Sequence, residues 1–142
     1  MRRRFFSITA LLLSGVAAGS DASRGRDLFD GRIVLPARVH GQDFALPAQA
    51  SRCAGCHAVP AAVTPAASGA ATSAAPPLTA ATLSTPARRR GGPPSRYDAT
   101  SLCTLLRSGV DPAHVMIQRT MPRYEISDTD CQALWLHLLE RR

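Results

Sequence analysis

Cys53-Ala-Gly-Cys56-His57 is the stretch that decides the fold of this chain. Two cysteines three residues apart, with a histidine directly after the second, form the pattern by which c-type haem is attached to a polypeptide. The two thiols add across the two vinyl groups of one haem, and the imidazole of His57 becomes the proximal ligand of the iron. The small residues Ala54 and Gly55 let the backbone lie close to the ring. The motif therefore predicts one covalent haem c, attached at Cys53 and Cys56.

Two other chemistries use closely spaced cysteines. A zinc site would take Cys53, Cys56, Cys103 and Cys131 as four thiolates. Structural zinc sites usually pair two C-x-x-C knuckles, whereas Cys103 and Cys131 are isolated in the sequence. A thioredoxin-like dithiol needs a strand before its cysteines and a helix after them, and Pro60 stands where that helix would propagate. The motif favours haem over both.

Residues 1–22 have the composition of an export signal, so the predicted mature domain is 23–142. Three arginines at 2–4 precede an apolar run from Phe5 to Ala18, and small residues at 16–18 and 20–22 offer two cleavage points. The run is too short for a comfortable membrane span, so we expect a membrane anchor only if the signal stays uncleaved. The arginines also resemble a twin-arginine signal. Haem attachment requires an unfolded chain with reduced thiols, which favours the general secretory route into a bacterial periplasm.

Charge and size narrow the class of protein further. All 17 Lys and Arg residues are arginines, and the formal net charge is +7. Removal of 1–22 leaves 14 arginines against 9 acids, or +5. This charge suits an acidic redox protein as a partner, and an exported protein has no access to nucleic acid. The mature length is enough for one small domain, to which a buried haem would add apolar volume.

Three segments have the apolar spacing of helices, at 23–29, 98–108 and 127–139. Asp98 and Ser127 are suitable N-caps for the second and third. Cys103 and Cys131 both fall on the apolar sides of these helices. In an oxidising compartment they would form a disulfide, and the alternative is two buried thiols.

The remaining segments give weaker signals. Residues 33–35 and 43–45 are predicted to pair as a small ribbon. Residues 58–96 are low in complexity, rich in Ala, Pro, Ser and Thr, and predicted to form a loose loop. Within this loop, a backbone carbonyl in Pro76-Pro77-Leu78-Thr79 could accept the N–H of the proximal imidazole. The alternative is that this stretch too is linker.

A six-coordinate haem also needs a ligand opposite His57. Met121 is the favoured candidate, because Pro122 keeps its backbone extended and lets the thioether project inward. Met116 is expected to pack as an ordinary apolar side chain. The histidines of the mature chain are expected at the surface or in turns, namely His40, His114 and His137.

These features resemble the small single-haem cytochromes c that have an N-terminal haem motif and a C-terminal methionine ligand. The resemblance is carried by Gly25 with Phe29, by Cys53-Ala-Gly-Cys56-His57, by Tyr97-Asp98 before the leucine helix, and by the segment from Met121 to Asp130. It implies an all-α fold wrapped around one haem, with the first and last helices crossing at Gly25 and Leu134. His137 stands where such proteins often have an aromatic residue.

The resemblance also implies a function. It predicts a periplasmic one-electron carrier with His57 and Met121 as iron ligands and no catalysis of its own, serving a dehydrogenase or a terminal oxidase. One alternative is an electron-transfer subunit of a larger periplasmic oxidoreductase, for which the insertion at 32–52 would be the docking surface. Another is a haem-based sensor, which would need an open sixth position on the iron.

Overall fold

The computed structural model describes residues 17–57 and 75–142 of the chain, in which helices and short antiparallel strand pairs are joined by loops and turns. Residues 1–16 of the predicted export signal (1–22) lie outside the described residues, and the remaining residues of the signal belong to the first helix. None of the described helices is both long enough and apolar enough to cross a membrane. The elements in chain order are α1 (Ala17–Asp30), β1 (Ala37–Arg38), α2 (Ala48–Ser51), α3 (Ala54–His57), α4 (Ala80–Ser84), β2 (Ala87–Arg88), β3 (Pro94–Ser95), α5 (Ala99–Ser108), β4 (Arg123–Tyr124) and α6 (Asp128–Glu140).

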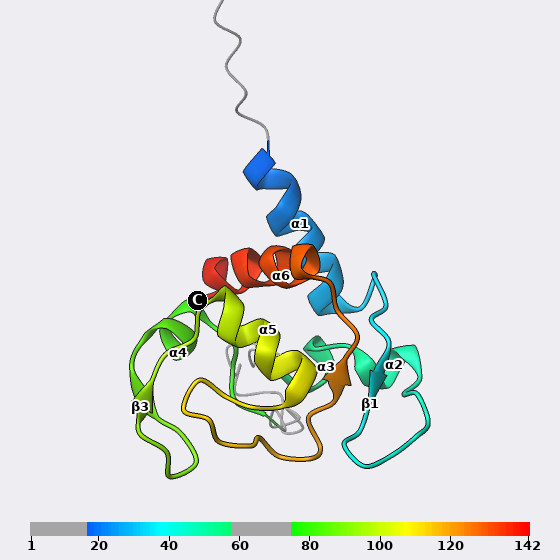
Figure 1. Ribbon diagram of the computed structural model, residues 1–142. Helices are drawn as coiled ribbons and strands as arrows, with labels where there is room; N and C mark the ends of the chain where they lie inside the picture. The colour runs from blue at the N-terminus through cyan, green and yellow to red at the C-terminus, as the bar shows by residue number, and fades with distance from the viewer. Residues whose placement is uncertain (1–16, 58–74) are drawn as a thin grey trace, which may run out of the picture.

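Helices α1 and α6, the first and the last, cross each other at one end of the molecule (Figure 1). The crossing is close at Gly25, where a β-carbon would overlap the carbonyl group of Ala133. Leu28 and Leu134, both almost fully buried, belong to the core that this crossing closes. The predicted first helix therefore exists, but within the described residues it already includes Ala17, six residues before its expected start.

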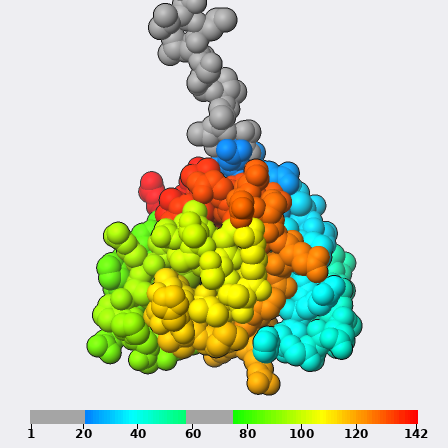
Figure 2. Space-filling model, viewed as in Figure 1, coloured from blue at the N-terminus to red at the C-terminus, as the bar shows by residue number. Residues whose placement is uncertain are grey.

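Helices α5 and α6 begin at their predicted caps, and α6 ends at Glu140, one residue beyond its predicted end. The side chain of Asp98 accepts a hydrogen bond from the backbone N–H of Ser101, and Ser127 does the same for Asp130. Gly109 ends α5 with φ of +78°, a left-handed conformation that favours glycine. Figure 2 shows α5 and the segment that follows it in the middle of the face in view.

A disulfide between Cys103 and Cys131 joins α5 to α6, with the α-carbons 5.6 Å apart. The bridge predicted from the two apolar helix faces is therefore formed, and the alternative of two buried thiols is wrong. Since α5 ends before the segment containing Met121 and α6 begins after it, the bridge ties both flanks of that segment together.

The ribbon predicted from residues 33–35 and 43–45 is wrong. Strand β1 instead pairs antiparallel with β4, so that Ala37 lies opposite Tyr124. Phe44 is largely exposed and therefore gives this segment no apolar face to bury. Pairing of β1 with β4 fixes the backbone just after Met121. Hairpin signals come from residues close together in the sequence, so they do not indicate this long-range pairing.

Residues 58–74 of the predicted loose loop (58–96) lie outside the described residues. For the rest of the segment the prediction is wrong, because it contains α4 and the β2–β3 pair. Thr79 and Thr82 form a reciprocal capping box at the start of α4. Strands β2 and β3 form a hairpin whose turn places Arg90 and Gly91 at φ of 48° and 79°. Two consecutive positive φ values match the twist of a hairpin. The arginine-rich run is thus a turn, which its composition alone does not indicate.

Candidate functional site

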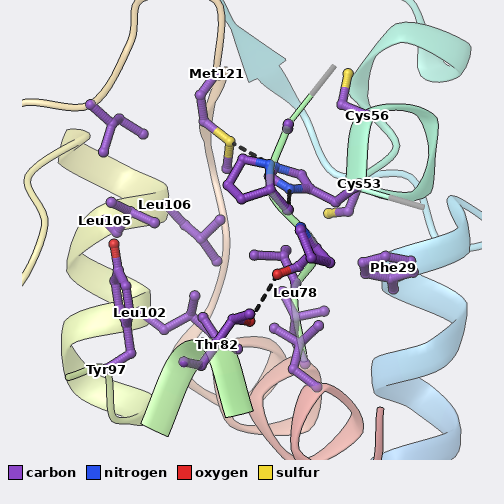
Figure 3. A pocket seen from close by; sticks show the side chains of 18 of the residues that line it. Phe29, Cys53, Cys56, Leu78, Thr82, Tyr97, Leu102, Leu105, Leu106 and Met121 are labelled. Atoms are coloured by element: carbon purple, nitrogen blue, oxygen red, sulfur yellow. Dashed lines mark hydrogen bonds between the residues drawn. The ribbon is translucent and has the colours of Figure 1, made fainter. Parts of the chain in front are cut away.

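One apolar cavity of about 810 Å³ lies at the centre of the fold. Its volume falls within the range of about 300–1,000 Å³ that is usual for ligand and cofactor pockets. Residues from α1, α3, α5 and α6 line it together with the segments around 76–83 and 117–122 (Figure 3). The predicted site residues Cys53, Cys56, His57 and Met121 all lie in this lining. Its apolar wall includes Phe29, Leu78, Leu83, Leu102, Leu105, Leu106, Ile117, Leu134 and Leu138.

His57 ends α3 and is buried in the cavity wall. Its Nδ1 lies 2.8 Å from the carbonyl oxygen of Pro76. A carbonyl can only accept, so Nδ1 carries a proton and donates it. This contact confirms the expectation that a carbonyl within 76–79 receives the imidazole N–H, and the alternative that the stretch is linker is wrong. The bond fixes the plane of the ring and leaves Nε2 directed into the cavity.

The Nε2 atom of His57 faces the sulfur of Met121 at 3.5 Å (Figure 3). In the neutral ring Nε2 has a lone pair and no proton, because the proton is on Nδ1, and a thioether sulfur also has no proton. Two electron-pair donors that face each other have no hydrogen bond to share. A Lewis-acidic metal ion held between them would use both lone pairs.

The electrostatics of the site keep the imidazole neutral. Burial lowers the pKa of His57, and the positive charge of Arg141 lowers it further, while the hydrogen bond to Pro76 opposes both. Neutral imidazole is the form that binds metals. The chain therefore presents His57 to the cavity as a neutral imidazole rather than as a cation.

The two thiols of the motif differ in their surroundings. Cys53 is buried, and burial raises the pKa of its thiol to about 11. Nearby, the hydroxyl of Tyr124 donates to the carbonyl of Ser51 at 2.9 Å, which anchors the residues just before the motif to β4. Cys56 is exposed at the edge of the cavity. One thiol thus lies inside the wall and the other at the rim, so both border the same space.

The structure argues against both alternative chemistries for the cysteines. Cys103 and Cys131 are joined as a disulfide and cannot supply two of the four thiolates of a zinc site. Within 17–57 and 75–142, no three His, Cys, Asp or Glu side chains are grouped as a metal site. A thioredoxin-like dithiol is preceded by a strand, whereas helix α2 and Arg52 precede Cys53 here.

The other candidate ligands lie outside the cavity lining. Met116 is 49% exposed, so the expectation that it packs as a core side chain is wrong. His40 and His114 are exposed, as expected. His137 is buried, contrary to expectation, with its ring centroid 5.7 Å from that of Phe29. It occupies a packing position between α1 and α6, which agrees with an aromatic-like role at that position.

Two residues that support the site, Thr82 and Arg141, were not predicted from the sequence. Thr82 donates from Oγ1 to the carbonyl of Pro77 at 2.8 Å and thereby orders the residues next to the Pro76 carbonyl. The only signal in the sequence is the spacing of Thr79 and Thr82, a threonine variant of a capping box. Arg141 donates to the carbonyl of His57 at 3.3 Å from the far end of the chain. No local pattern indicates a contact over that separation.

The residues present fit a covalently attached haem. Two thiols border the cavity, a neutral imidazole nitrogen and a thioether sulfur face each other within it, and the walls are apolar. Comparisons with known proteins found no family, no curated protein and no solved structure that matches the chain.

Proposed function

We propose that this chain is a single-haem cytochrome c with a cytochrome c-like helical fold, acting as a one-electron carrier. Haem c would be bound covalently through Cys53 and Cys56, with His57 and Met121 as the two iron ligands. The single observation that carries the proposal is the opposition of His57 Nε2 and Met121 Sδ inside an apolar cavity that both thiols border. When bound, haem supplies an iron that changes its charge by one electron, and methionine–histidine ligation raises its potential.

The chain's own residues hold the two ligands in place. The Pro76 carbonyl orients His57, and the hydrogen-bonded turn from Gln118 to Met121, 3.2 Å between O and N, precedes the pairing of β4 with β1. Apolar side chains form most of the wall around the ligands. Because an apolar wall has few dipoles to reorient, a change of charge inside it would cost little reorganisation.

The proposed location is a bacterial periplasm and the proposed partners are redox proteins. Two features support it. The first 22 residues have the composition of an export signal. The Cys103–Cys131 disulfide is of the kind that persists in an oxidising compartment.

Haem staining after denaturing electrophoresis, together with intact mass, tests the proposal. The full chain is expressed in bacteria with working haem-attachment machinery, beside Cys53→Ala/Cys56→Ala and the matched control Cys103→Ala/Cys131→Ala. We expect the parent chain and the control to carry one haem and the first variant to carry none. A parent mass equal to the signal-cleaved polypeptide alone would refute the proposal. Carbon monoxide binding to the ferrous protein at neutral pH would instead support a sensor.

A further inference from the structure

Two arginines donate hydrogen bonds to the backbone carbonyls of the two residues whose side chains face each other in the cavity. Arg141, just after α6, donates from Nη2 to the carbonyl of His57 at 3.3 Å. Arg123, in β4, donates from Nη1 to the carbonyl of Met121 at 2.5 Å. The two guanidinium groups thus flank the site, one beside each candidate ligand.

Neither guanidinium has a full set of partners. The Nε and Nη2 atoms of Arg123 and the Nε atom of Arg141 are buried without a hydrogen-bond partner. Neither side chain forms an ion pair with a carboxylate in the part of the chain that the structure describes. Five other arginines do form such pairs there, namely Arg24, Arg32, Arg38, Arg90 and Arg107.

The fold holds both charges in place at a cost in free energy. Arg123 packs over Gly109, where a β-carbon would overlap its guanidinium, and it lies opposite Arg38 in the β1–β4 register. Like charges opposite each other in a strand pair are destabilising. Arg141 lies with its guanidinium carbon 3.9 Å from the centre of the Phe29 ring, a favourable cation–π contact but not a neutralising one. Desolvation lowers the pKa of both side chains, which shows that burial disfavours their charged form.

We infer that Arg123 and Arg141 are tuning residues that raise the reduction potential of the proposed haem, because they place two positive charges beside its ligands and neither charge is ion-paired with a carboxylate in the described residues. The inference rests on the proposed function. A positive charge repels the reduced iron less than the oxidised iron, because the reduced iron carries one positive charge fewer. Both arginines are partly buried, so this difference is screened less than it would be in bulk water. The bonds to the ligand residues' own carbonyls keep both charges at a fixed place.

Redox titration of the purified haem protein tests the inference with Arg123→Gln, Arg141→Gln and Arg123→Lys. Arg38→Gln is the matched control, because it also removes one positive charge but from an exposed side chain paired with Glu125. Each glutamine variant is expected to lower the ratio of reduced to oxidised haem at a fixed potential at least threefold, which corresponds to a fall of about 28 mV for one electron. Arg123→Lys should keep the parent potential, and Arg38→Gln should shift it by less than half as much.

The near-infrared absorption of the ferric protein separates tuning from structural damage. It should persist in all variants, because the inference leaves Met121 bound to the iron. Shifts no larger than that of Arg38→Gln would overturn the inference, and so would a shift that occurs only with loss of this band. A parent protein without haem would overturn both the proposed function and the inference, whereas a haem protein with unshifted variants would overturn the inference alone.

Discussion

Gly25 of α1 lies against the carbonyl group of Ala133 in α6 so closely that position 25 has no room for a β-carbon. This contact sets how near the first helix approaches the last. Phe29, one turn further along α1, reaches the cavity wall, and Leu134, the residue after Ala133, lines the same wall. The separation of the two helices therefore also sets the shape of one side of the cavity.

Gly25→Ala is expected to destabilise the protein by about 1–3 kcal/mol, because the added methyl group forces α1 away from α6. The free energy of unfolding in urea measures the effect. Gly55→Ala is the matched control: its β-carbon would meet only the Arg52 side chain at 3.5 Å and the Gln49 carbonyl oxygen at 4.0 Å, both ordinary contacts. Alanine inside a helix should be neutral or slightly stabilising there. Equal losses in the two variants would contradict the close crossing.

Met121→Ala is expected to lower the reduction potential, to abolish the near-infrared absorption of the ferric protein, and to let carbon monoxide bind the ferrous form. The reason is that Met121 is the side chain that faces His57 across the cavity. Met116→Ala is the control, since Met116 is half exposed and outside the lining. If the absorption band survives in Met121→Ala and disappears in Met116→Ala, the assignment of the ligand is wrong.

Replacing Cys103 and Cys131 together with alanine is expected to lower the free energy of unfolding by about 3 kcal/mol, because the bridge closes a loop of 28 residues. Urea unfolding with and without reductant measures this loss. The reductant should weaken the parent protein and leave the double variant unchanged. Thiol titration of the unfolded, unreduced haem protein should find no thiols, and a result of two would show that the bridge is absent.

Before haem attachment, the stability of the chain is expected to fall as the pH falls below 6.5. Burial lowers the pKa of both His57 and His137 from the ordinary value of 6.5. The unfolded chain then binds protons at a higher pH than the folded chain, so the stability from the neutral rings is complete above pH 6.5 and is lost as the pH falls through the lowered values.

Urea unfolding of Cys53→Ala/Cys56→Ala between about pH 8 and pH 5 measures this dependence. Adding His57→Gln should make the fall in stability shallower, and adding His137→Gln as well should make it shallower still. A slope that is the same with and without these two histidines would assign the dependence to other groups.

Local signals were enough to predict the parts of the structure that depend on nearby residues. Asp98 and Ser127 cap helices that begin as expected, because capping involves residues only three positions apart. The disulfide followed from two apolar helix faces. The C-x-x-C-H spacing was enough to predict that Cys53, Cys56 and His57 lie together, and all three line one cavity.

Features that depend on distant contacts were missed or wrongly predicted. Strand β1 pairs with β4 rather than with the nearby residues 43–45. This pairing depends on the position of the backbone just after Met121, which is far away in the sequence. The positive φ of Arg90 gives a hairpin turn in a run whose composition is that of a linker. Arg141 reaches His57 across most of the chain. None of these contacts leaves a periodic or compositional trace in the sequence.

The crossing of α1 and α6 has a consequence for the order in which the site is assembled. Because α6 follows every other cavity-lining segment in the chain and supplies Leu134 and Leu138 to the cavity wall, the wall is incomplete until α6 has been synthesised and packed. Throughout that interval Cys53, which the finished fold buries, is as accessible as Cys56. A chain that emerges with its N-terminal part first therefore keeps both thiols open to modification until α6 packs against α1.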